Sequence, residues 1–71
     1  MNGYSVDDLI KLAAAGGGFA LNASGFSRDD LIRIADAASV KQARVTFRGL
    51  RLPVNDMITI AAAGKGAVFF E

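Results

Sequence analysis

The sequence predicts an α/β fold of three tandem helix-strand repeats, forming a short solenoid-like two-layer structure with a three-stranded parallel sheet and helices on one face. Two observations predict this fold. The chain repeats one phrase three times, and within each phrase the apolar residues change from a helical to an alternating period. With 71 residues, we expect one domain over 1–71, with repeats of approximately 3–24, 25–48 and 49–71.

The repeat becomes visible when the chain is aligned on Asp8, Asp30 and Asp56, which are separated by 22 and 26 residues. Four apolar positions then coincide in all three segments. They hold Leu9, Leu31 and Met57; Ile10, Ile32 and Ile58; Leu12, Ile34 and Ile60; and Ala13, Ala35 and Ala61. A unit of this size cannot bury its apolar face alone, so its neighbours must bury it.

The layout resembles the leucine-rich-repeat class of α/β solenoids in its repeat length and in its alternation of strand and helix. The consensus of that class, L-x-x-L-x-L-x-x-N, is absent from all three units. No family membership and no function follow from the resemblance.

The first repeat predicts a helix that starts after Ser5 and ends near Gly16, followed by a strand over 19–23. Ser5 and Asp8 have the spacing of a capping box, with Asp in place of Glu, and a glycine commonly follows the last helical turn. The stretch FALNA alternates between apolar and small or polar residues, which indicates a strand.

The other two repeats follow the same plan. Ser27 predicts the second helix start, and the strand ARVTF follows over 43–47. In the third repeat Pro53 takes the cap position, where it tolerates a helix start without a side-chain bond. Gly64 marks the third helix end, and the strand AVFFE follows over 67–71.

Strands that are connected through helices should run parallel, and right-handed crossovers place all the helices on one face of the sheet. Alternation along the strands then assigns each residue to a face. The helix side is predicted to hold Phe19, Leu21, Ala23, Ala43, Val45, Phe47, Ala67 and Phe69. The opposite face is predicted to hold Ala20, Asn22, Arg44, Thr46, Arg48, Val68 and Phe70.

The uncovered sheet face predicts self-association, because parallel sheets are ordinarily covered on both faces. Val68 and Phe70 are the candidate oligomer interface at its C-terminal edge. We expect a homo-oligomer, most simply a two-fold dimer joined through the bare face or edge to edge. The alternative is that Phe70 folds under a helix and the protein is monomeric.

An enzyme is not expected. The sequence contains no Cys and no His, and the serines that could act as nucleophiles serve as helix caps. The paired aspartates are explained by the helix starts, because adjacent helical residues diverge by about 100°. We therefore predict no catalytic residue, no metal site and no cofactor.

Positive charge is concentrated in residues 28–51, which carry a net +3, while the remainder carries −2. Arg44 and Arg48 share the predicted outer sheet face and Arg51 follows them, so these arginines are the candidate partner-binding or anion-binding patch. The alternative is that charge protects an exposed strand from aggregation. A net charge of +1 without an exposed aromatic platform favours protein association over nucleic-acid binding.

The leading hypothesis is a small non-enzymatic α/β repeat protein acting as a homo-oligomeric protein-interaction module or accessory factor. The alternative is a nucleic-acid-binding protein that uses the central basic patch on the outer sheet face. No apolar stretch reaches the ~20 residues that span a bilayer, so no membrane association is expected. The N-terminal residues lack the features of a secretory signal, so we expect a cytoplasmic protein.

Overall fold

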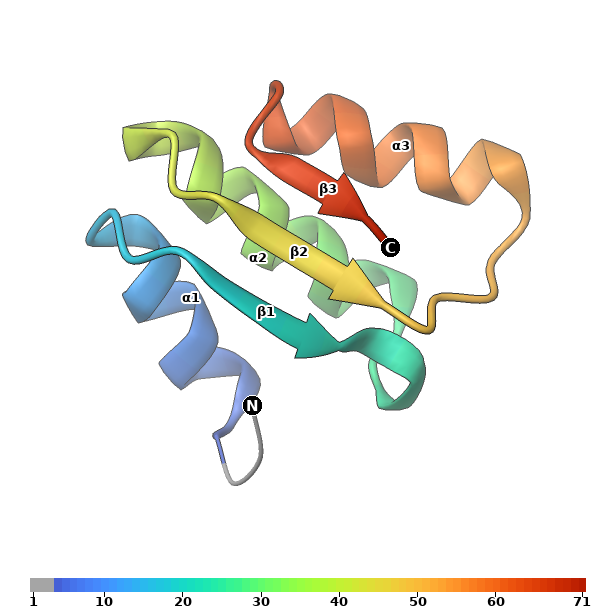
Figure 1. Ribbon diagram of the computed structural model, residues 1–71, viewed down its shortest axis with the longest axis horizontal. Coiled ribbons are helices and arrows are strands. Elements are labelled where there is room, and N and C mark those ends of the chain that lie inside the picture. The colour runs from blue at the N-terminus through green and yellow to red at the C-terminus, as the bar shows by residue number, and fades with distance from the viewer. Residues whose placement is uncertain (1–3) are drawn as a thin grey trace.

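The computed structural model describes residues 4–71, and within them it contains three α-helices, one 3₁₀-helix and three β-strands (Figure 1). In chain order they are α1 (Val6–Ala14), β1 (Phe19–Asn22), η1 (Ala23–Gly25), α2 (Arg28–Lys41), β2 (Val45–Arg48), α3 (Val54–Gly64) and β3 (Val68–Phe70). The strands form an open parallel sheet in the order β1-β2-β3.

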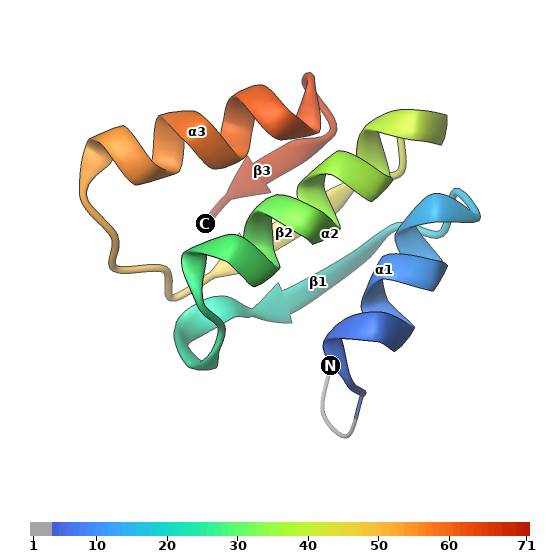
Figure 2. The ribbon, with the colours of Figure 1, turned by 180° about the vertical axis from the view of Figure 1, so that it is seen from behind.

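All three helices lie on the same side of this sheet. They stand behind the strands in Figure 1 and in front of them in Figure 2. The predicted α/β class, the three-stranded parallel sheet and the placement of helices on one face are therefore confirmed. The finer interpretation as three tandem repeats of a solenoid stays a prediction.

The helix starts follow the predicted capping pattern. At α1 the backbone N–H of Asp8 donates to Ser5 Oγ at 3.2 Å, and the N–H of Ser5 donates to Asp8 Oδ2 at 3.4 Å. At α2 the N–H of Asp30 donates to Ser27 Oγ at 3.3 Å. Helix α3 begins after Pro53 without a side-chain cap. Two of the three helices thus satisfy orphan N–H groups with serine, as predicted.

The core fills the space between the sheet and the helices. Phe47 in the central strand is fully buried, with Val45 and Leu21 beside it. The helices contribute small and branched apolar residues, mostly from the four aligned positions of the sequence. Ala38 is buried outside those positions, whereas Leu12 and Ile58, which occupy them, are exposed. The buried set is Leu9, Ala13, Leu21, Ala23, Leu31, Ile34, Ala35, Ala38, Ala43, Val45, Phe47, Ile60 and Ala67.

Each helix is followed by a residue with positive φ that turns the chain into the next strand. The strand residue three positions later then occupies the same row of the sheet in all three cases. These pairs are Gly16 (φ 93°) with Phe19, Gln42 (φ 53°) with Val45, and Lys65 (φ 49°) with Val68. The left-handed residue at the end of α3 is therefore Lys65, one position after the predicted Gly64.

The predicted facing of the third strand is wrong. Val68 pairs with Val45 and Phe70 pairs with Phe47, so both point to the helix side and pack against the core. Phe69 points outward and is 46 % exposed. The prediction aligned Ala67 with Ala43, which is one residue out of step with the observed pairing. A shift of one residue moves every side chain of a strand to the other face.

Candidate functional site

The sheet face that points away from the helices is where the sequence placed its candidate binding residues. We call it the outer face, and no helix lies over it in Figure 1. It is formed by Ala20 and Asn22 of β1, Thr46 and Arg48 of β2, and Phe69 of β3. Val68 and Phe70 were predicted to belong to this surface, but they lie on the opposite side of the sheet and pack against the core.

Phe69 is the exposed aromatic residue of the outer face. It pairs with Thr46, and the guanidinium carbon of Arg44 lies 6.0 Å from the centre of its ring. An arginine over an aromatic face is attracted by the negative charge of the ring face. The expectation that no exposed aromatic platform exists is therefore wrong, since the one-residue shift of β3 brings Phe69 to the surface.

Arg48 lies at the C-terminal end of β2 and is paired with an acidic residue. Its Nε lies 3.1 Å from Oε1 of Glu71, which follows β3. Both side chains are more than half exposed, at 58 % and 62 %, so water screens the pair and its contribution to stability is small. The carboxylate of Glu71 nevertheless offsets the positive charge of Arg48 at this end of the face.

The three candidate arginines do not converge on one point. Arg44 and Arg48 are four residues apart along an extended segment, which separates their Cα atoms by about 13 Å. Arg51 lies beyond the end of β2, in the connection to α3. The structure therefore presents a line of positive charge, with Phe69 beside Arg44 and Glu71 beside Arg48, rather than a compact anion clamp.

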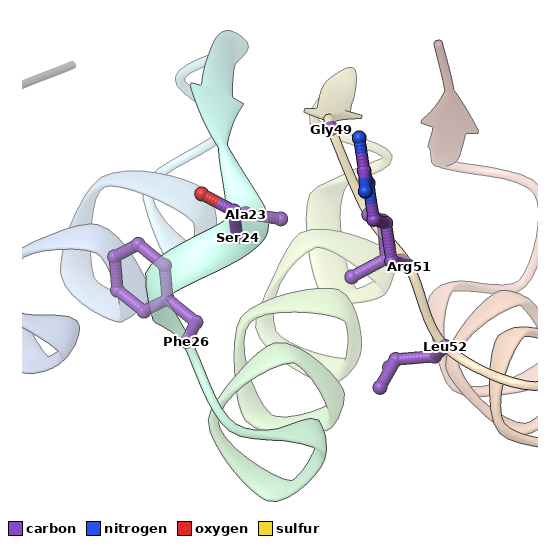
Figure 3. Close-up of a pocket in the computed structure, with 7 residues that line it drawn as sticks. Ala23, Ser24, Phe26, Gly49, Arg51 and Leu52 are labelled. Atoms are coloured by element: carbon purple, nitrogen blue, oxygen red, sulfur yellow. The ribbon is translucent and has the colours of Figure 1, made fainter.

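A shallow pocket opens beyond the C-terminal ends of β1 and β2. Its volume is about 180 Å³, and it is lined by Ala23, Ser24, Phe26, Gly49, Leu50, Arg51 and Leu52. Figure 3 shows Phe26 on one side of the opening with Arg51 and Leu52 on the other. Arg51 contributes the charged group of this lining. The volume is below the ~300 Å³ typical of small-molecule sites, so the pocket alone assigns no ligand.

An ion pair that no sequence pattern predicts joins two helices. Arg28 Nη1 donates to Asp56 Oδ1 at 3.2 Å, which connects the first turn of α2 to the first turn of α3. The hydrogen bond that Arg28 donates to Asp56 raises the pKa of Arg28, and the charges of Asp56 and Asp29 add to this effect. No local signal could reveal the pair, because its members are 28 residues apart and meet only through helix packing.

The polar and charged side chains of the described residues lie at the surface or are partly buried. Within residues 4–71, no polar or charged residue is buried and no group of three or more His, Cys, Asp or Glu side chains is placed to hold a metal ion. Catalytic groups are commonly buried and have shifted pKa values. In the same part of the chain, no helix combines the length and the apolar character needed to cross a membrane.

Comparison of the chain with protein-family models, with curated proteins and with solved structures found no match. The proposal of a function therefore rests on the surfaces of this chain.

Proposed function

We propose that this chain is a small non-enzymatic interaction module of three helix-strand repeats, located in the cytoplasm, that works by forming homo-oligomers. The observation that carries the proposal is the position of its exposed apolar side chains. Phe69 is 46 % exposed on the outer face, and Val54 and Ile58 of α3 are 70 % and 59 % exposed. These residues lie on surfaces that the helices and strands within residues 4–71 leave uncovered.

The size of the chain supports association. A domain of about 60 residues buries only about 60 % of the surface that its unfolded chain exposes, which leaves its core marginal. Small domains are commonly stabilised by disulfides, metals or oligomerisation, and this sequence has no Cys and no His. Burying the uncovered apolar surface against a second copy would add the missing stabilisation.

The experiment is a concentration series by sedimentation velocity, with native mass spectrometry to count the copies in each species. We expect the average mass to rise with protein concentration up to about 1 mM, because a small interface corresponds to weak binding. A sample that stays monomeric over the whole series contradicts the proposal.

A second candidate function is binding of single-stranded nucleic acid on the outer face. The observation that favours it is the exposed ring of Phe69 beside Arg44, with Arg48 farther along the same face. Single-stranded nucleic acids bind where bases stack on aromatic rings and phosphates contact basic side chains. This arrangement has one ring, and Glu71 offsets part of its charge, so it supports nucleic-acid binding less strongly than self-association.

Fluorescence anisotropy with labelled single-stranded DNA and RNA tests the second candidate. Binding should weaken as salt increases, and Arg44→Ala/Arg48→Ala should lower the salt slope by about 2 if each arginine contacts one phosphate. The matched control is Arg33→Ala, which removes an exposed positive charge from α2 instead. No binding by the unmodified chain at low salt removes this candidate.

A further inference from the structure

The two internal helix junctions show which side of each helix faces its neighbour. Arg28 of α2 bonds to Asp56 of α3, so the side of α2 that carries Arg28 faces α3. Ile32 follows Arg28 by four residues and therefore lies on the same side of the helix. It is partly buried and packs against the core. The side of a helix that faces the next helix thus carries the first and the fifth residue after the N-cap.

The same side of α3 has no neighbour in the described chain. The residues one and five positions after its N-cap, Pro53, are Val54 and Ile58. Their counterparts on α1, Val6 and Ile10, are partly buried and pack against the core, whereas Val54 and Ile58 are 70 % and 59 % exposed. We call the outward side of α3, together with the unpaired edge of β3, the C-terminal flank.

At the opposite end of the sheet, the other side of a helix is left without a neighbouring helix in the described chain. Asp56 and Ile60 are four residues apart on the side of α3 that faces α2, and Ile60 is fully buried. The equivalent residues of α1 are Asp8 and Leu12, and this side of α1 has no helix beside it in the described chain (Figure 2). Leu12 is 38 % exposed. We call this side of α1, with the unpaired edge of β1, the N-terminal flank.

The two flanks correspond to the two surfaces that meet where α1 packs on α2 and where α2 packs on α3. The C-terminal flank exposes a valine and an isoleucine on the side that faces the next helix in α2, and the N-terminal flank exposes a leucine on the side that faces the preceding helix in α3. Each end strand is paired on one edge only, because the sheet order is β1-β2-β3. Joining the flanks on the pattern of the Arg28–Asp56 contact would place Val54 opposite Asp8, so this pair of positions brings no like charges together.

We infer that successive copies of this chain associate head to tail, with the C-terminal flank of one copy on the N-terminal flank of the next. Helix α3 then packs on α1 of the next copy, and β3 pairs in parallel with its β1. The inference rests on the proposed homo-oligomerisation and names its surfaces. It differs from the two-fold dimer, because a contact between two different surfaces leaves one flank open at each end and permits growth into chains.

The dimensions of the molecule limit the area of this contact. The extents are 29 × 26 × 19 Å, so a flank up to 26 Å long and 19 Å deep covers at most about 500 Å² per copy, or about 1,000 Å² in total. Specific interfaces begin near this size. Head-to-tail association should therefore be weak, reversible and dependent on concentration.

The test uses one charged substitution on each flank. Ile58→Glu blocks the C-terminal flank and Leu12→Glu blocks the N-terminal flank, and each variant alone should associate at least about tenfold more weakly than the unmodified chain. An equimolar mixture still contains one intact copy of each flank and should form a 1:1 dimer that grows no further. Sedimentation velocity and native mass spectrometry distinguish these species.

The matched control is Val40→Glu, which makes the same change at a 72 % exposed position of α2 outside both flanks. It should leave association unchanged. Circular dichroism confirms that each variant folds, and Leu12→Gln replaces Leu12→Glu if the glutamate variant does not.

Two results overturn the inference while leaving the proposed homo-oligomer in place. One is unchanged association of Ile58→Glu, and its loss in Phe69→Glu would then assign the contact to the outer face. The other is a mixture of the two flank variants that stays monomeric although the unmodified chain associates. Only an unmodified chain that never associates contradicts the proposed function as well, so the two failures are distinguishable.

Discussion

The ring of Phe70 lies against the ring of Phe47, with 6.2 Å between the ring centroids and 49° between the ring planes. Because Phe47 is fully buried, this contact belongs to the helix side of the sheet and leaves Phe69 outside. Phe70→Ala should lower the free energy of unfolding by about 2 kcal/mol through lost burial and lost ring contact. Phe69→Ala should lower it by less than about 1 kcal/mol. Urea unfolding followed by circular dichroism measures both, and the reverse order contradicts the observed facing of β3.

Gly64→Ala should destabilise the protein by roughly 1–3 kcal/mol, because the added methyl group would overlap the side chain of Val68. In an unobstructed helix the same change stabilises by about 1 kcal/mol, so the sign of the effect is diagnostic. Thermal unfolding of the variant and of the unmodified protein measures this change in stability. The control is Gly25→Ala, since an added methyl group there meets nothing within 4 Å.

Ser27→Ala should lower the free energy of unfolding by about 1 kcal/mol, because the N–H of Asp30 loses the acceptor that Ser27 Oγ provides. Ser27→Asp restores a side-chain acceptor at the same place and should retain most of the stability. Denaturant unfolding of the three proteins tests this. Equal losses in both variants would show that the serine contributes something other than its cap.

Removing Arg28 and Asp56 singly and together should reveal a small favourable coupling between α2 and α3 that weakens as salt is added. A base whose pKa is raised by folding contributes stability below its ordinary pKa and loses it only as pH rises through the raised value. The pKa of arginine lies far above neutrality, so the contribution of Arg28 should be constant between about pH 6 and about pH 9. A double-mutant cycle at low and high salt, repeated at both pH values, measures these effects.

The helix starts could be predicted because their signals are local. Ser5 and Ser27 cap the helices by bonding to N–H groups three residues ahead, and the sequence shows that spacing directly. The central strand could be predicted for a similar reason. Thr46 and Arg48 alternate with Val45 and Phe47, so burial separates the two faces clearly.

The facing of β3 could not be predicted from alternation, because Val68, Phe69 and Phe70 are all apolar and either face accepts them. The deciding information was the distance from the helix end. Lys65 takes the left-handed conformation that Gln42 takes before β2, and counting three residues from each gives the correct register. The one-residue shift of β3 changes the candidate site directly, because the outer face holds Phe69 where the prediction placed Phe70.

The order of the strands also bears on how the chain reaches its native state. The main packed pairs are α1 with α2, α2 with α3, β1 with β2 and β2 with β3, so each element packs on the next element of its own type. The paired strand residues Phe19 and Val45 are 26 positions apart, and Val45 and Val68 are 23 positions apart. Closing these two similar intervals costs a similar amount of loop entropy, because the cost of closure grows only slowly with loop length. Folding can then begin at either adjacent pair and spread to the remaining segment, and the amide hydrogens of β2, held on both edges, should exchange with solvent most slowly.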